Sequence, residues 1–146
     1  MRVLALDVGK RRIGLAVSDE LGITAQGLPT LERTRVRDDL DTLAKIVSDY
    51  GVSLILVGDP KHMSGGDSRQ AAYTREFGDR LAGHTGIRVD YWDERLTTVQ
   101  AERVLKESGI SIEKRARAVD RLAAVILLES YLDSLPRASH EEEPLG

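Results

Sequence analysis

Apolar and polar positions near the N-terminus follow the two-residue repeat of β-strands. Residues 3–19 hold two apolar runs rich in β-branched side chains, separated by a turn with one glycine and three cations. This pattern predicts a β-hairpin whose first strand ends in a carboxylate, Asp7. Residues 25–33 alternate weakly around a glycine and a proline, which is typical of an edge strand because proline cannot donate to a ladder. The first three strands are therefore predicted to form an antiparallel meander.

The pattern then changes to the three- and four-residue spacing of an amphipathic helix. This spacing runs from Val36 to Tyr50, and Gly51 is predicted to end the helix. Residues 52–57 are almost continuously apolar, as expected for a strand that is covered on both faces and runs parallel to the first. Residues 58–68 are rich in glycine and turn formers, which predicts a loop.

The rest of the chain alternates between helical and strand patterns. It predicts a helix over about 69–81, a strand over 87–92, a helix over 97–109 and a last helix over about 118–132. Together these elements predict an α/β domain over residues 1–135, with helices on the faces of its sheet, and a short acidic tail over residues 136–146.

Several carboxylates follow the ends of the predicted parallel strands. Ligands gather beyond the carboxyl ends of such strands, so acids from three places should share one edge, and an acid of the last helix could join them. These acids are Asp7, Asp59, Asp93, Glu94 and, from the last helix, Asp120. Clustered carboxylates repel one another unless they share a cation. With no cysteine and three scattered histidines, the chain favours Mg²⁺ or Mn²⁺ over zinc. For each acid taken singly, a helix cap, a turn or a surface charge is the competing interpretation.

Composition limits the classes of function. The 146 residues carry a net charge of −3, which argues against a protein that coats nucleic acid by bulk electrostatics. Local cationic clusters, at residues 10–12 and 114–117, fit an enzyme that grips a polyanion at one site, although solvated charged faces would look the same. No apolar run approaches the roughly 20 residues of a membrane helix. A secretory signal pattern is also absent, so the cytoplasm is the expected location.

Several motifs, in the right order, resemble those of the YqgF/RuvX family of RNase H-like nucleases. They are Leu6-Asp7-Val8-Gly9 with the Lys10–Asp19 segment, Asp93-Glu94-Arg95-Leu96-Thr97-Thr98, and Asp120 followed by Ala123-Ala124. The resemblance implies an RNase H-like fold, a five-stranded mixed sheet in the order 3-2-1-4-5. It also implies metal-dependent cleavage of Holliday junctions or of the small-subunit ribosomal RNA precursor. Two metal ions held by Asp7, Glu94 and Asp120 are expected.

One position departs from the family pattern. The loop after the fourth strand usually has the sequence Gly-Leu-Pro in this family, and here it is Gly58-Asp59-Pro60. Three interpretations of Asp59 are open: an additional metal ligand, a residue that contacts the ligands without binding the metal, or a local substitution that faces water.

Candidate contacts to the substrate follow from the chemistry of a polyanion. Cations can neutralise the phosphates that flank the cleaved bond, and Thr97 at a helix start can donate to one. The candidates are Lys10, Arg11, Arg12, Arg95, Thr97, Lys114, Arg115 and Arg117. With one tryptophan and few other aromatic residues, stacking on bases is expected to contribute little.

Two further functions compete with a nuclease. The first is a non-catalytic nucleic-acid-binding or ribosome-assembly module that keeps the fold and its cations. The second is phosphotransfer, because Asp-x-Gly in a strand-one hairpin also occurs in actin-like ATPases. Those need a duplicated domain, and this chain has one copy and no Walker-type loop. Symmetric cleavage of a junction would require two active sites, which a two-fold homodimer supplies.

Overall fold

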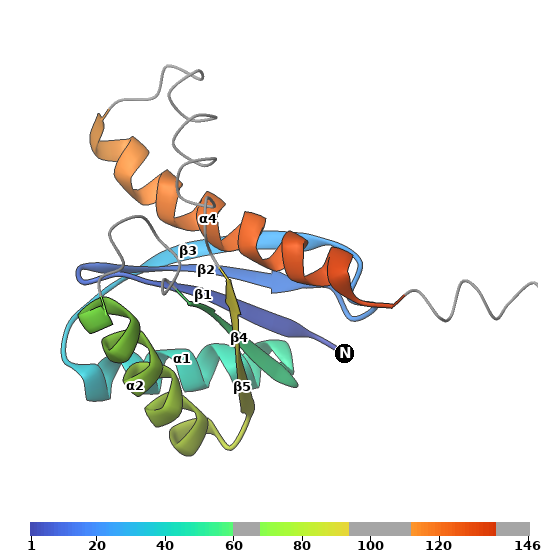
Figure 1. Ribbon diagram of the computed structural model, residues 1–146, viewed down its shortest axis with the longest axis horizontal. Helices are drawn as coiled ribbons and strands as arrows, with labels where there is room; N and C mark the ends of the chain where they lie inside the picture. The colour runs from blue at the N-terminus through green and yellow to red at the C-terminus, as the bar shows by residue number, and fades with distance from the viewer. Residues whose placement is uncertain (60–67, 94–111, 137–146) are drawn as a thin grey trace, which may run out of the picture.

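The computed structural model describes residues 1–59, 68–93 and 112–136, without the side chains of residue 68 and residues 112–117. A five-stranded mixed sheet forms the centre of the described part (Figure 1), in the order β3-β2-β1-β4-β5. The strands are β1 (Val3–Val8), β2 (Arg12–Ser18), β3 (Ala25–Glu32), β4 (Leu54–Asp59) and β5 (Arg88–Asp93). The first three form the predicted antiparallel meander, and β4 and β5 continue the sheet parallel to β1. This is the strand order that the resemblance implies, so the predicted fold class is confirmed.

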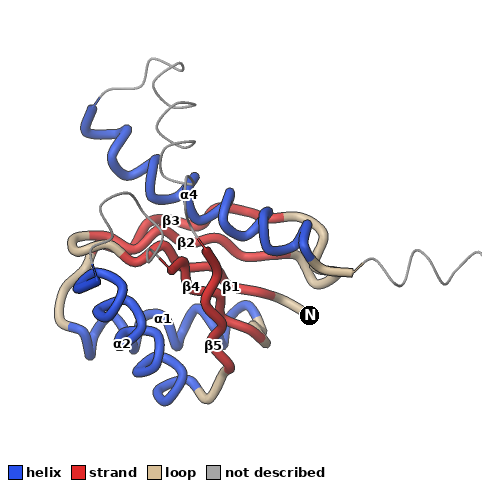
Figure 2. Tube along the Cα trace, viewed as in Figure 1, coloured by secondary structure: helices blue, strands red, loops and turns tan. Residues whose placement is uncertain are grey.

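Three described helices cover the two faces of the sheet. They are α1 (Val36–Tyr50), α2 (Ser68–Thr85) and α4 (Ile112–Ser134). Helices α1 and α2 lie on one face and α4 lies on the other (Figures 1 and 2). Below, these are called the α2 face and the α4 face. The amphipathic pattern that predicted α1 buries Leu40, Leu43 and Val47, and Gly51 ends this helix with a positive φ of 63°.

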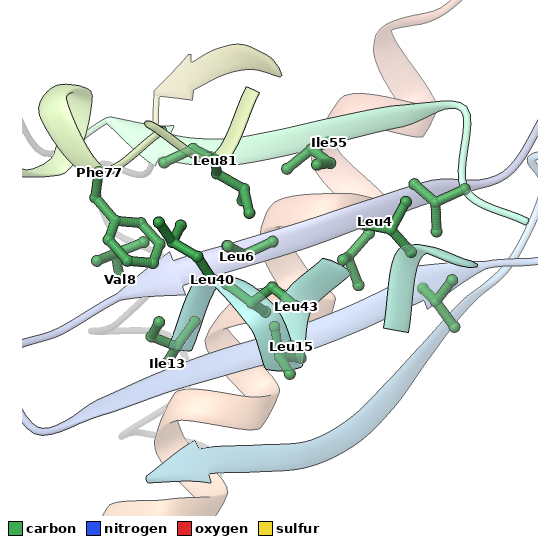
Figure 3. Packing of buried hydrophobic residues seen from close by; sticks show 14 of the residues in the cluster. Leu4, Leu6, Val8, Ile13, Leu15, Leu40, Leu43, Ile55, Phe77 and Leu81 are labelled. Carbon is green, nitrogen blue, oxygen red and sulfur yellow. The ribbon is translucent and has the colours of Figure 1, made fainter. Parts of the chain in front are cut away.

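The two-residue repeat of β1 divides its side chains between the two faces. Leu4, Leu6 and Val8 pack toward α1 and α2 (Figure 3), whereas Val3 and Ala5 belong to the cluster around α4. The same alternation in β4 sends Ile55 and Val57 to the α2 face and Leu54 and Leu56 to the α4 face. Side chains two positions apart in a strand therefore lie on the same face, and below they are said to have the same parity. Parity decides which face a polar residue at the end of either strand joins.

Helix α4 approaches the sheet closely because glycines lie beneath it. A Cβ atom on Gly14 would come within 1.9 Å of the backbone oxygen of Asp120, and one on Gly27 would come within 2.6 Å of the Arg121 side chain. Ala16 of β2 and Ala124 of α4 are fully buried in the same contact. Small residues on both surfaces therefore bring the α4 backbone almost onto β2.

Some boundaries differ from the predictions. Strand β4 continues to Asp59, so Gly58 and Asp59 belong to the strand and not to the predicted loop. Helix α2 is longer than predicted at both ends, and α4 begins six residues earlier, at Ile112. The helix predicted over 97–109 and the tail from 137 onward lie outside the described residues. Within the described residues, no helix is both long and apolar enough to span a bilayer.

Candidate active site

Two of the predicted catalytic acids, Asp7 and Asp120, are both neighbours of one glycine, Gly14. Asp7 of β1 pairs with Gly14 of β2, and it has the same strand parity as Val3 and Ala5, so it lies on the α4 face. On that face the backbone of Asp120 is in contact with Gly14. The absence of a side chain at position 14 thus allows a helix from the far end of the sequence to place a carboxylate beside the end of β1.

The carboxylate of Asp120 is half-buried and has one cationic partner. The Arg12 Nε donates a hydrogen bond of 2.7 Å to Asp120 Oδ2, and the two side chains are 29% and 23% exposed. Burial raises the pKa of Asp120 above the ordinary aspartate value, although the hydrogen bond and charge of Arg12 act in the opposite direction. Among the described residues, Arg12 therefore does not fully offset the burial of this negative charge, and an additional cation would stabilise it.

The cationic turn between β1 and β2 is held by backbone hydrogen bonds. The Gly9 N–H donates to the Arg12 carbonyl at 2.9 Å, and the Arg33 N–H donates to the Arg11 carbonyl at 2.9 Å. The turn also lines a hollow of about 410 Å³, whose walls are Gly9, Lys10, Arg11, Arg12, Gln70 and Asp120. All three predicted turn cations thus border the same space as Asp120.

A buried arginine that the sequence analysis did not single out supports this turn. The Arg33 Nη1 donates to the Gly9 carbonyl at 3.0 Å, and the Arg33 Nε donates to Asp39 Oδ2 at 3.2 Å. The Arg33 guanidinium also lies 4.8 Å from the ring centroid of Phe77. Position 33 is the last residue of a predicted edge strand, where an arginine is ordinarily solvated, so no local pattern indicates that its side chain is buried.

Two other predicted acids lie at the same sheet edge but belong to the opposite face. Asp59 has the parity of Val57 and is buried on the α2 face, where its Oδ2 is 2.5 Å from Arg75 Nη2. The interpretation that Asp59 faces water is therefore wrong, because α2 covers the carboxylate and provides its counter-ion. Asp93 pairs with Asp59 and has the parity of Tyr91, which also lies on the α2 face.

Arg75 connects this second cluster to β5. Its guanidinium lies 4.8 Å from the ring centroid of Tyr91, and the Tyr91 hydroxyl is 2.8 Å from both the Arg75 carbonyl and Asp79 Oδ1. Burial and the hydrogen bond to Asp79 raise the pKa of Tyr91 well above the ordinary tyrosine value. These contacts fasten α2 to the end of the sheet, and strand parity places Asp59 and Asp7 on opposite faces of it.

The remaining predicted site residues lie in parts of the chain whose side chains are not described. Glu94, Arg95 and Thr97 lie outside the described residues, and Lys114, Arg115 and Arg117 belong to the part of α4 whose side chains are not described. Among the described residues no group of three or more histidines and acids is arranged to hold a metal. The oxygen donors of Asp7 and Asp120 match the chemistry of Mg²⁺ or Mn²⁺, with Glu94 as the third predicted donor.

Comparison with known proteins establishes the family. Residues 1–134 match the model of the RuvX family, which is described as a Holliday junction resolvase. The chain belongs to the RuvX family. A RuvX relative from Koribacter versatilis is 51% identical over 145 residues, which are 99% of this chain and 94% of the relative. One from Symbiobacterium thermophilum is 47% identical over 134 residues, 92% of this chain and 93% of the relative. Both are named "Putative pre-16S rRNA nuclease".

Solved structures share the fold at low sequence identity. T. thermophilus RuvC in complex with a Holliday junction substrate has a TM-score of 0.56 and 16% identity, over 90% of this chain and 94% of that one. The fowlpox virus resolvase with its junction DNA has a TM-score of 0.57 and 16% identity, over 94% and 100% of the two chains. These similarities, with the strand order, establish the RNase H-like fold of this RuvX member.

Proposed function

We propose that this chain is a metal-dependent endonuclease that hydrolyses phosphodiester bonds in structured nucleic acid. The observation that carries the proposal is that Asp7 and Asp120 both lie next to Gly14 on the α4 face, beside a turn with three cations. Half-buried carboxylates near a cationic hollow are suited to hold divalent ions against a phosphate backbone. Family membership supports the same class of reaction.

Each group of residues has a distinct task in the proposed reaction. Asp7, Glu94 and Asp120 would hold Mg²⁺ or Mn²⁺, with two ions expected per site. When bound, such ions lower the pKa of a water molecule and stabilise the attacking and leaving oxygens of an in-line displacement. Lys10 and Arg11 neutralise the phosphates that flank the cleaved bond. Arg12 keeps the Asp120 carboxylate oriented toward the hollow.

Two substrates follow from the names of the relatives and the family. They are the precursor of 16S ribosomal RNA and the four-way DNA junction. Cleavage of both strands of a junction requires two active sites, so a two-fold homodimer is part of the junction hypothesis.

Cleavage assays with and without Mn²⁺ test the proposal. The protein is incubated with a four-way junction, duplex DNA and a precursor rRNA fragment, beside the variants Asp7→Asn and Asp41→Asn. Asp41 is an exposed acid of α1 that contacts His84, so its variant controls for loss of one negative charge. We expect cleavage of a structured substrate only with Mn²⁺. We also expect Asp7→Asn to lose cleavage but keep binding, and Asp41→Asn to keep both.

Two outcomes would contradict the proposal. Full activity in Asp7→Asn would reject the assignment of the carboxylates. Binding that is indifferent to Mn²⁺, with no cleavage of any substrate, would instead identify a non-catalytic nucleic-acid-binding module.

A further inference from the structure

A second hollow shares lining residues with the one that contains Asp120. It also measures about 410 Å³, and the described residues that line it are Lys10, Arg69, Gln70 and Tyr73. Lys10 and Gln70 line both hollows, so the two adjoin at these residues. The first hollow includes Asp120 on the α4 face, and the second includes residues of the first turns of α2.

Tyr73 provides a fixed aromatic surface in the second hollow. The residue is 38% exposed, while its hydroxyl is hydrogen-bonded to Arg33 Nη1, and the Arg33 guanidinium carbon lies 5.4 Å from the ring centroid. Arg33 is itself held by the buried carboxylate of Asp39 and by the Gly9 carbonyl. The tyrosine ring is thus oriented by a rigid partner before any ligand arrives, which reduces the entropy lost on binding.

The lining of the second hollow matches the chemistry of one nucleotide. Lys10 and Arg69 bring two cations for phosphate oxygens, and Gln70 offers an amide that can donate and accept. A base can stack on the exposed ring of Tyr73 because every base has a π-face. The volume lies within the range of roughly 300–1,000 Å³ typical of small-ligand pockets.

We propose that this hollow is a subsite for an unstacked nucleotide next to the one whose phosphate is cleaved. Tyr73 stacks on the base, and Lys10 and Arg69 contact its phosphates. The proposal rests on the proposed nuclease function and specifies its substrate class. A base reaches Tyr73 only after leaving its own stack, so a strand with an unpaired or flexible nucleotide beside the cleavage point is preferred over a continuous duplex.

Binding measurements that do not depend on cleavage test the stacking contact. The probes are a four-way junction and a precursor rRNA fragment with single 2-aminopurines placed in turn around the cleavage point mapped with the wild-type protein. All binding is measured in an Asp7→Asn background, which prevents cleavage. Tyr73→Leu removes the ring, whereas Tyr73→Phe keeps the ring and loses only the hydroxyl bound by Arg33.

The two tyrosine variants should differ clearly. We expect Tyr73→Leu to weaken binding by about 5- to 100-fold and to abolish the fluorescence change of one 2-aminopurine position. Tyr73→Phe should bind within about twofold of the parent and keep that change. Equal losses in the two variants, or unchanged binding and fluorescence in Tyr73→Leu, would overturn the subsite. Thermal melts of both variants establish that they are folded.

A charge substitution tests the phosphate contact. Arg69→Gln should reduce the slope of log affinity against log salt by about one unit, because one phosphate contact is lost. Arg88→Gln is the matched control, since the Arg88 side chain is 70% exposed at the start of β5, at the opposite end of the strand from the sheet edge that carries the acids. An equal change of slope in the two variants would contradict a specific role for Arg69.

Competition with a free nucleotide distinguishes a strand subsite from a nucleotide-binding pocket. Millimolar AMP should not displace the strand, because a free nucleotide lacks the neighbouring contacts in the Asp120 hollow; displacement would identify a nucleotide-binding pocket instead and overturn the proposal. The outcomes also separate the two proposals. If the wild-type protein cleaves its substrate but Tyr73→Leu binds like the parent, only the subsite proposal is rejected. If the wild type neither binds nor cleaves nucleic acid, the proposed function is rejected as well.

Discussion

Two arginine–aspartate pairs flank the hairpin turn, and they differ in burial and in how many hydrogen bonds the carboxylate accepts from the protein. In the Arg33–Asp39 pair the side chains are 5% and 1% exposed, and Asp39 also accepts hydrogen bonds from the backbone N–H and hydroxyl of Thr34. In the Arg12–Asp120 pair they are 29% and 23% exposed, and the pKa of Asp120 remains raised. The first pair is a closed structural network, whereas the second leaves negative charge that a ligand can use.

The largest expected effect comes from breaking the buried pair. Asp39→Asn should lower the free energy of unfolding by about 3–5 kcal/mol, because the buried Arg33 cation would lose its counter-ion. Urea unfolding measures this change. Asp41→Asn, an exposed position on the same helix, should change stability by less than about 0.5 kcal/mol. A loss in Asp39→Asn no larger than that of Asp41→Asn would show that the pair is not structural.

The second-largest effect is expected from displacing α4, which carries Asp120 of the partly exposed Arg12–Asp120 pair, called the open pair below. Gly14→Ala should cost about 1–3 kcal/mol in stability, since its Cβ would overlap the Asp120 backbone and force the helix away from β2. Cleavage should fall more steeply than stability, because Asp120 moves relative to Asp7. Gly83→Ala in α2 is the control, since a Cβ there meets no atom within 4 Å and alanine favours the helix. Calorimetric melts and cleavage rates of the two variants make the comparison.

Breaking the open pair itself should matter for binding more than for folding. Arg12→Gln should change the free energy of unfolding by about 1 kcal/mol or less, because both side chains are partly solvated. Nucleic-acid affinity should fall because Asp120 loses the partner that orients it, whereas the slope of log affinity against log salt should change by less than about one unit, since Arg12 is paired with Asp120 and not with a phosphate. Titrations at several salt concentrations measure both. A stability loss comparable to that of Asp39→Asn would abolish the distinction between the two pairs.

The smallest expected effect is a stabilisation that depends on pH. The raised pKa of Asp120 contributes stability that is present below the ordinary aspartate value of about 4 and is lost as the pH rises through the folded-state pKa. In metal-free buffer, Asp120→Asn should therefore melt slightly above the wild type at pH 7. The difference should vanish near pH 3. A lower melting temperature for Asp120→Asn at neutral pH would indicate that the Arg12 contact outweighs burial.

Local patterns predicted the elements well because each depends on neighbouring residues. The hairpin around the cationic turn and the helix from Val36 to Tyr50 follow from spacing alone, and the strand order follows from the family resemblance. The end of β4 was wrong by two residues, because Gly58 and Asp59 are typical loop residues. Asp59 remains in the strand because Arg75, sixteen positions later on α2, neutralises it.

The candidate site was predictable as a set of residue types but not as an arrangement. The sequence places Asp7, Asp59 and Asp93 at one sheet edge, and the structure agrees. It does not indicate that Asp7 lies on the α4 face while Asp59 lies on the α2 face, because the exact last residue of each strand decides this. Arg33 and Tyr73 were missed for a related reason, since their roles depend on contacts between elements distant in the chain.

The alternation of β4 also shows how small a change separates an acid that supports the fold from one at the proposed reaction site. Gly58 immediately precedes Asp59, has the parity of Leu56, and lies one strand away from Asp7 on the α4 face. A carboxylate moved back by a single position would leave Arg75 and become a neighbour of Asp7. In this sheet, the role of an acidic residue therefore depends less on its being acidic than on which face its odd or even position in the strand gives it.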